Sequence, residues 1–280
     1  MQKIIVEPKY NNKKLSIFLY SHFSGLSSST FHKALRKKDI RINDKRVNED
    51  TIIHEFDTIT IYITDNLLFK EIQKIYEDNN ILVVNKPSEM EVVSNDPSSL
   101  TNILKKEYEF IEPCHRIDRN TTGIVLFAKS QEALDILLQK FESKEIEKHY
   151  RCKVLGKMPK SHDILEAYLF KDNKKALVYI SNEPKKGYIK IQTKYKVLSE
   201  NKDENTSILD IELITGKTHQ IRAHLAYIGH PIIGDGKYGI NEINKKFKAK
   251  YQILENYSIT FNFTQNAKIL NYLKNKTIKL

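Results

Sequence analysis

The chain is poor in the residues that build cross-links and membrane spans. Among its 280 residues there are two cysteines, which form neither a CxxC pair nor a spacing typical of metal ligands. No apolar stretch approaches the roughly 20 residues that span a bilayer. The N-terminal segment MQKIIVEPKYNNKK lacks the apolar centre of a signal peptide. We therefore expect a cytoplasmic protein without disulfides, monomeric and with no membrane and no obligate protein partner.

Several signatures of catalysis are also missing. There is no Walker loop, no G-x-G-x-x-G motif and no G-x-S-x-G elbow, so neither a nucleotide cofactor nor a serine hydrolase is indicated. His219, His224 and His230 are spaced by five and six residues, which does not place them on one helical face. Cys114 adjoins His115. Adjacency in sequence does not place the histidine where it could act as a base on the thiol, so a cysteine nucleophile is not indicated. We expect no metal and no cofactor.

What the chain does have is positive charge and enough apolar residues for a core. The formal net charge is +11 and the pI is about 9.3, while 40 % of the residues are hydrophobic. This hydrophobic content suits a globular protein. The basic balance favours a phosphate-rich partner such as nucleic acid, although a soluble lysine-rich surface would give the same charge.

Residues 1–64 are predicted to form a small separate unit. Leu15, Phe18 and Leu19 lie at helical spacing, and Ser28 or Ser29 can cap a second helix. A short hairpin follows, and the alternation in TITIYI, residues 58–63, predicts a last strand. A cluster of basic residues at the end of the second helix and in the hairpin would share one face of this unit. That face either binds phosphates or is a charged, solvated surface. The cluster consists of Arg36, Lys37, Lys38, Arg41, Lys45 and Arg46.

Residues 65–74 are predicted to be a linker, and residues 75–280 a second domain. Short apolar runs at 81–84 and 124–128 indicate buried strands, and alternation around residues 150–154 and 209–213 indicates two more. Ser130 can cap a helix between them. Many strands with few intervening helices predict an α+β fold with a mixed, mainly antiparallel sheet.

The segment HRIDRNTTGIVLFAKS, residues 115–130, places a carboxylate at the mouth of a sheet. Asp118 lies between two arginines, just before the apolar run that starts at Ile124. Such a carboxylate is a good candidate for a catalytic group, but Asp118 with Arg116 could equally be a plain salt bridge. These two interpretations stay open on this segment alone.

A second dense segment, TGKTHQIRAHLAYIGHPIIGDGKYG, spans residues 215–239. Thr218 is the predicted N-cap of a helix that ends at Gly229. His219 and Arg222 are three residues apart and share a face of that helix. A helix start that carries Lys217 and Arg222 favours an anion, either an RNA phosphate or Asp118.

Two resemblances follow from these segments. The run RKKDIRINDKRVNEDTIIHEFDTITIYI resembles an S4 RNA-binding domain, with Asn43-Asp44 and Phe56-Asp57 where that family usually has glycine at the turn and a Gly-Asp pair. Four further blocks occur in the order of another family: IYEDNNILVVNKP, HRIDRNTTGIVLFAKS, KHYRCKVLG and TGKTHQIRAHLAYIGHPIIGDGKYG. They resemble an RluA-type pseudouridine synthase, with an N-terminal S4 domain as in its large-subunit ribosomal RNA branch.

The second resemblance implies the pseudouridine synthase fold and roles for particular residues. Asp118 matches the catalytic aspartate, Tyr150 the active-site tyrosine, and Arg222 the basic partner that would keep Asp118 ionised and oriented. Arg116 matches an arginine thought to open the RNA stack around the target base. The residues expected to bind RNA are His115, Arg116, Lys148, Lys217, His219, Gln220, Arg36, Lys37, Lys38, Arg41 and Arg46.

The implied reaction breaks the C1′–N1 bond of a uridine, turns the base and rejoins it through C5. It needs no external atom and no redox change, so it needs no cofactor. The departures from the family pattern are Lys217 for arginine, Thr122 for serine, and Glu89 for a glycine. Three alternatives stay open: the same chemistry on transfer RNA, an RNA-binding or folding factor without catalysis, and a metal-dependent hydrolase.

Overall fold

A computed structural model describes residues 1–280. The chain forms two compact units, of which the first comprises residues 1–72 and 93–109 and the second residues 73–92 and 110–280. Residues 93–109 fold with the first unit because Asp96 accepts the Ser28 backbone N–H and Lys106 donates to the Tyr20 carbonyl. No helix is long and apolar enough to cross a membrane.

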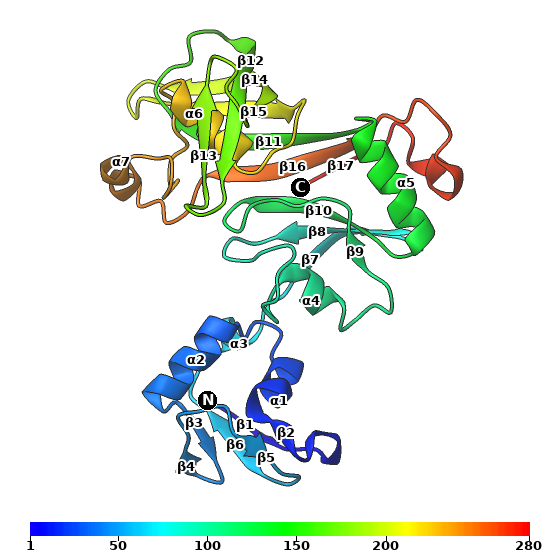
Figure 1. Ribbon diagram of the computed structural model, residues 1–280, viewed down its shortest axis with the longest axis vertical. Helices are drawn as coiled ribbons and strands as arrows, with labels where there is room; N and C mark the ends of the chain where they lie inside the picture. The colour runs from blue at the N-terminus through cyan, green and yellow to red at the C-terminus, as the bar shows by residue number, and fades with distance from the viewer. The chain divides into compact units, whose positions relative to one another are not determined.

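The first unit is a small four-stranded sheet with helices on one face (Figure 1). The sheet runs in the order β1-β6-β3-β4, and β2 pairs separately with β5. Its elements are β1 (Gln2–Ile5), η1 (Pro8–Tyr10), β2 (Lys13–Lys14), α1 (Leu15–His22), α2 (Ser28–Lys37), β3 (Ile40–Ile42), β4 (Lys45–Arg46), β5 (Ile52–Ile53), β6 (Thr58–Ile61), α3 (Asp65–Leu68) and α4 (Leu100–Leu104).

Helices α2 and α4 of the first unit begin where a serine hydroxyl accepts a free backbone N–H. Ser27 caps α2 by accepting the Thr30 N–H. The predicted cap at Ser28 or Ser29 was therefore wrong, since the helix is capped by the residue before them. Phe31, Ala34 and Leu35 of α2 pack with isoleucines from the inner face of the sheet. The last strand stops at Ile61, two residues earlier than the alternation predicted.

Two positions where the S4 pattern has glycine adopt the left-handed backbone conformation that glycine favours. Asn43 and Asp44, in the turn between β3 and β4, have φ of 48° and 65°, and Phe56 has φ of 67°. Asn and Asp tolerate such angles in a hairpin turn, whereas Phe does so only at an energetic cost. At both places the backbone therefore adopts a conformation that glycine permits.

The second unit holds one large sheet with helices packed against it. Its elements are β7 (Gln73–Glu77), β8 (Ile81–Lys86), β9 (Glu112–Pro113), β10 (Thr122–Ala128), α5 (Gln131–Glu142), β11 (Ile146–Leu155), β12 (His162–Asp172), β13 (Leu177–Ser181), β14 (Ile189–Asn201), β15 (Thr206–Leu213), α6 (Gln220–Tyr227), α7 (Asn241–Lys246), β16 (Leu254–Phe261), η2 (Lys268–Leu273) and β17 (Thr277–Lys279).

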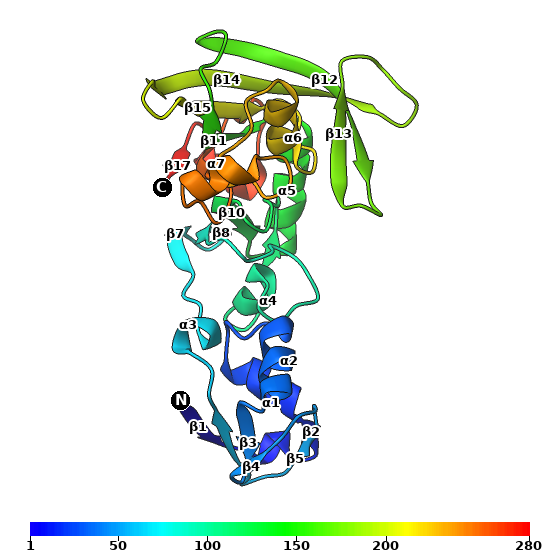
Figure 2. The same cartoon turned by 90° about the vertical axis from the view of Figure 1, so that its left-hand side faces the viewer.

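The strands of this sheet follow the order β13-β12-β14-β15-β11-β16-β10-β8-β7, with β17 beside β16 and β9 beside β10. Every pairing is antiparallel except that of β10 with β16, so the prediction of an α+β fold with a mixed, mainly antiparallel sheet is confirmed. In Figure 2 the long strands β12 and β14 cross the top of the view. Ser130 caps α5 as predicted, and Ala223 of α6 packs against residues of β12, β13 and β14.

Gly123 permits the one parallel strand pairing of the sheet, that of β10 with β16. Its φ is +109°, and a Cβ atom at this position would lie 2.2 Å from the backbone oxygen of Asn256 on β16. Only glycine permits both the conformation and the approach. The loop that carries Asp118 leads into β10 at this pairing. The pairing of β10 with β16 therefore positions that loop at the centre of the sheet.

Candidate active site

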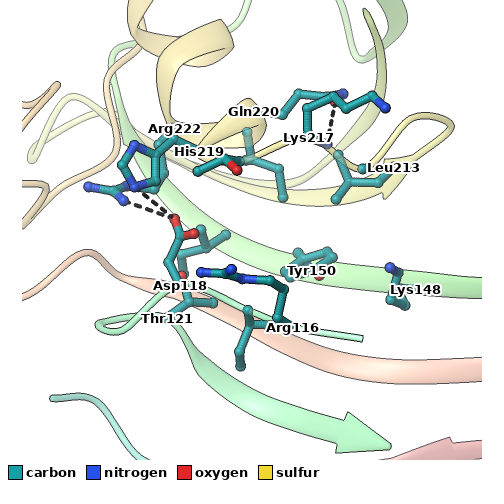
Figure 3. Close-up of a pocket in the computed structure, with 15 residues that line it drawn as sticks. Arg116, Asp118, Thr121, Lys148, Tyr150, Leu213, Lys217, His219, Gln220 and Arg222 are labelled. Carbon is teal, nitrogen blue, oxygen red and sulfur yellow. Dashed lines mark hydrogen bonds and ion pairs between the residues drawn. The ribbon is translucent and has the colours of Figure 1, made fainter. Parts of the chain in front are cut away.

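A pocket in the second unit collects side chains from three places in the chain (Figure 3). The loop before β10 supplies Arg116 and Asp118, strand β11 supplies Lys148 and Tyr150, and the segment 216–222 at the start of α6 closes the pocket. Its volume of about 130 Å³ is several times the space that one water molecule needs. The three sequence blocks that suggested an active site therefore meet at one cavity.

A buried chain of charges forms the centre of the site. Arg222 donates from Nη1 to Asp118 Oδ2 at 2.9 Å, as the sequence predicted. The same guanidinium donates from Nε and Nη2 to the two carboxylate oxygens of Asp235, at 2.7 and 3.0 Å. Asp235 is fully buried and also accepts the backbone N–H groups of Lys237 and Tyr238. One arginine thus joins a structural carboxylate to the carboxylate at the pocket.

Arg222 and Asp235 favour each other's charged form although both are buried. Burial works against the charge of Arg222, but Asp235 and Asp118 offset it and raise the pKa of the guanidinium. Burial also works against the charge of Asp235, but the hydrogen bonds from Arg222 keep the pKa of that carboxyl below its usual value. Asp118 turns Oδ2 toward Arg222 and forms no hydrogen bond through Oδ1, which leaves Oδ1 available to a substrate.

Tyr238 and His219 form a hydrogen-bonded pair beside Asp118. The Tyr238 hydroxyl accepts the backbone N–H of Val178 and lies 2.9 Å from His219 Nδ1. Burial raises the pKa of Tyr238, so the phenol keeps its proton, and Nδ1 is the acceptor within reach. Burial also lowers the pKa of His219, which favours the neutral ring. That ring then carries its proton on Nε2, 4.0 Å from Asp118 Oδ2.

Helix α6 starts differently from the prediction. It begins at Gln220, and His219 precedes it in the left-handed conformation with φ of 55°, so Thr218 is not its N-cap. The Gln220 side chain accepts the Lys217 N–H and the Thr215 hydroxyl, and this closes the turn that Thr218 was expected to cap. His219 is held in a strained conformation beside the catalytic candidate, as is common at functional sites.

Strand β11 places Lys148 and Tyr150 on the pocket face because side chains two residues apart share one face of a strand. Tyr150 is 5 % exposed, and its burial, followed by the charge of Asp118, raises the pKa of its hydroxyl. Its ring is therefore a neutral, flat wall of the pocket. Burial lowers the pKa of Lys148 to about 8, and its Nζ lies 4.9 Å from the centre of the Phe141 ring.

The Asp118 loop is held from the opposite side by Lys86. This fully buried lysine donates to the backbone carbonyls of Pro87, Met90 and Arg119. It therefore ties the end of β8 to the residue that follows Asp118. The pattern of residues around Lys86 carries no sign of this role in holding the loop.

Several predicted site residues lie elsewhere. His115 is not part of the pocket: its Nε2 accepts the Leu126 N–H, and its ring contacts Phe141, so it fixes the loop from behind. Burial raises the pKa of the Cys114 thiol, which makes it a poor nucleophile. No group of three His, Cys, Asp or Glu side chains is arranged to hold a metal ion.

The basic cluster of the first unit does not share one face. Arg41 and Arg46 stand opposite each other on β3 and β4, and they point away from the core side of the sheet. Helix α2, which carries Arg36 and Lys37, packs against the core side, and Lys38 ends that helix. The prediction failed because it did not apply the alternation of strand side chains to the hairpin.

Asp235 and Tyr238 are the site residues that the sequence analysis missed. Both lie in the segment GDGKYG, where three glycines and an aspartate indicate only a turn. Glu89, which stands where the family pattern has glycine, has φ of 62°, so it occupies a left-handed position that suits glycine. Its carboxylate lies 3.6 Å from Lys250 Nζ, and a hydrogen bond from Tyr251 together with Lys250 lowers its pKa.

The fold of this unit is that of the pseudouridine synthases. The solved structure of human RNA pseudouridylate synthase domain containing 1 superposes with a TM-score of 0.60, over 70 % of this chain and 80 % of that one, at 20 % identity. The family described as RNA pseudouridylate synthase matches residues 80–227, more than half of the chain, including Asp118, Tyr150 and Arg222. The chain belongs to this family and is an RNA pseudouridine synthase.

Two curated relatives differ in the RNA that their names specify. The ribosomal large subunit pseudouridine synthase C of Vibrio vulnificus is 30 % identical over 259 residues, which cover 85 % of this chain and 80 % of that protein. The mitochondrial tRNA pseudouridine(32) synthase of Saccharomyces cerevisiae is 31 % identical over 243 residues, which cover 84 % of this chain but only 52 % of the yeast protein. The chain therefore spans about half the length of the yeast relative.

Proposed function

We propose that this enzyme isomerises uridines of large-subunit ribosomal RNA, with Asp118 as its catalytic residue. The contact that carries the proposal is the 2.9 Å bond between Arg222 and Asp118 Oδ2, which leaves Oδ1 open to the pocket. Ribosomal RNA is favoured because the Vibrio relative matches along 80 % of its length. Transfer RNA is the second candidate, since the yeast relative is equally similar over the shared part.

The reaction balances within the uridine itself. The C1′–N1 bond breaks, the detached uracil turns, C5 bonds to C1′, and the proton of C5 leaves while N1 gains one. Asp118 acts on the sugar, either as a nucleophile that holds it covalently or as a base that removes a sugar proton. Both routes need the Asp118 carboxylate in a fixed position, and Arg222, held by Asp235, orients it through the hydrogen bond to Oδ2.

The other pocket residues suit a flipped-out uridine. Tyr150 offers its neutral ring to the base, and bases that leave an RNA stack commonly lie against aromatic rings. Arg116 is exposed and lies between Asp118 and Tyr150 in Figure 3, which suits contact with the RNA around the vacated position. Lys148 and Lys217 line the pocket and can meet phosphate or carbonyl oxygens.

Release of tritium from [5-³H]uridine in RNA tests the proposal. We expect wild-type protein to release tritium from large-subunit ribosomal RNA transcripts, and Asp118→Asn to lose at least about 10²–10⁴-fold in rate while still binding RNA. The matched control is Asp203→Asn, which removes an exposed carboxylate in the turn before β15. Equal rates for Asp118→Asn and wild type would falsify the role of Asp118.

The same assay separates the substrates. Release from transfer RNA but not from ribosomal RNA would overturn the proposed substrate and support the second candidate. Wild-type protein that binds both RNAs yet releases tritium from neither would favour an RNA-binding factor.

A further inference from the structure

The outer face of the four-stranded sheet carries a row of cations. Arg46 on β4 stands opposite Arg41 on β3, Arg41 opposite Thr60 on β6, and Thr60 opposite Lys3 on β1. Neighbouring strands lie about 4.8 Å apart, so the row crosses the whole sheet in roughly 14 Å. The isoleucines on either side of Arg41 and Thr60 pack in the core between the sheet and the helices, and therefore the row lies on the opposite face of the sheet.

The cations of this row have no anionic partner in the protein. Lys3, Arg41 and Arg46 form no ion pair, although the chain has many such pairs elsewhere. Like charges directly opposite each other on antiparallel strands are destabilising, and Arg41 and Arg46 are such a pair. In addition, Nε of Arg41 is buried and has no hydrogen-bond partner. An arrangement that costs stability in the free protein is explained by an anionic ligand.

An aromatic ring lies within the same face. The guanidinium of Arg41 lies 5.1 Å from the centre of the Tyr62 ring, and Tyr62 is 44 % exposed. Exposed rings and guanidinium planes are the surfaces on which unpaired bases stack, while neighbouring cations hold the phosphates. A duplex keeps its bases stacked internally and has no use for such a ring, so this face suits a single strand.

We propose that this sheet face, formed by Lys3, Arg41, Arg46 and Tyr62, binds a single-stranded segment of the RNA substrate. The three cations contact consecutive phosphates, and an unpaired base stacks on Tyr62. The proposal rests on the proposed RNA substrate, and it adds a surface separate from the pocket that holds Asp118.

Fluorescence anisotropy with a labelled oligouridylate of about twelve nucleotides tests the charges. The variant Lys3→Gln/Arg41→Gln/Arg46→Gln is compared with Lys9→Gln/Lys13→Gln/Lys14→Gln, which removes the same charge from exposed lysines of the same unit. We expect the first variant to lose about tenfold or more in affinity, with the slope of log affinity against log salt reduced by roughly two, and the control to lose much less. Equal losses in both variants overturn the proposal.

Tyr62 tests the stacking. Tyr62→Leu is expected to lose about tenfold in affinity for the oligouridylate and little for an RNA duplex, while Tyr62→Phe keeps its affinity. Equal binding by Tyr62→Leu and Tyr62→Phe removes the single-strand assignment. Full-length protein is required, because residues 93–109 fold with the first unit and a truncated chain would lose its partner.

Two further measurements keep this test separate from folding and from the reaction. If the row is a ligand site, the triple variant Lys3→Gln/Arg41→Gln/Arg46→Gln melts at the same or a higher temperature, because repulsion between Arg41 and Arg46 is removed. A lower melting temperature would mark the row as structural and overturn the proposal. Tritium release from wild-type protein tests the proposed reaction and does not depend on the sheet face. A failure of the reaction can therefore be distinguished from a failure of RNA binding by the sheet face.

Discussion

Arginines in the two compact units meet opposite surroundings. The side chain of Arg222 in the second unit is 7 % exposed and contacts two carboxylates, one of them through two hydrogen bonds. Arg41 and Arg46 in the first unit face each other across two strands and contact no carboxylate. In our proposals all three arginines take part in the binding or reaction of RNA, but only Arg222 is paired with carboxylates of the protein.

The difference reflects what each region has to do. A site that promotes a reaction needs its charges fixed before the substrate arrives, and Asp235 fixes Arg222 so that Asp118 is held in place. A binding surface gains affinity by leaving its cations free to replace the counterions of a phosphate backbone. In this protein, therefore, the cation of the proposed catalytic pocket is paired with carboxylates, whereas the cations of the proposed binding surface are not.

The largest expected difference between the regions concerns stability. Asp235→Asn leaves the buried guanidinium of Arg222 with only one carboxylate, and breaking a buried ion pair costs about 3–5 kcal/mol. Arg46→Gln breaks no ion pair and is expected to cost nothing, or to stabilise slightly. Chemical denaturation of the two variants beside wild type measures both values. A loss under about 1 kcal/mol for Asp235→Asn would show that Asp235 does not anchor the site.

The next effect is on the rate alone. Tyr238→Phe removes the O–H that donates to His219 Nδ1, so the ring loses the fixed tautomer that aims Nε2–H at Asp118. We expect kcat for tritium release to fall about tenfold, with RNA affinity and KM little changed. Nitrogen NMR of labelled histidine should show His219 as the Nε2–H tautomer in wild type and a mixture in the variant. Unchanged spectra would contradict the assigned hydrogen bond.

Asp118, Tyr150 and Arg222, which the sequence led us to expect in one site, line the same pocket, while their catalytic roles stay predictions. Asp118, Tyr150 and Arg222 belong to blocks with strong local patterns, and their roles followed from a family resemblance rather than from periodicity. Asp235 and Tyr238 were not found, because a buried partner inside a turn segment looks like any turn residue until the chain is folded. The start of α6 was misplaced because the left-handed conformation of His219 has no signal in residue type.

For the fold, the alternation of apolar residues predicted the strands but not every surface. The mixed sheet was expected, and β8 and β10 were found where apolar runs indicated them. The division of the basic cluster of the first unit depends on which strand residues face the helices, a fact that the register of β3 with β6 decides. The joining of residues 93–109 to the first unit is a long-range contact with no local pattern.

A smaller effect is expected from pH in the pocket. Burial lowers the pKa of Lys148 to about 8, so the free protein loses this charge as pH rises from 7 to 9. RNA affinity of the Asp118→Asn protein, which binds without turnover, should fall about fivefold over this range, and adding Lys148→Met should remove that dependence. Because unfolded Lys148 holds its proton more tightly, stability rises with pH from about 8 toward 10.5. The exposed Lys171→Met is the control.

The smallest expected effect compares one strained backbone position in each unit. Phe56 is 71 % exposed and Glu89 is bound to Lys250 and Tyr251, yet both have positive φ where the family patterns have glycine. Phe56→Gly should be about 1 kcal/mol more stable than Phe56→Ala, which removes the same ring but keeps the strain of a Cβ atom. Glu89→Gly should gain less over wild type, since it also gives up an exposed ion pair worth up to about 1 kcal/mol. Thermal melting of the three variants beside wild type measures both differences, and equal stability of Phe56→Gly and Phe56→Ala would show that the turn relaxes without cost.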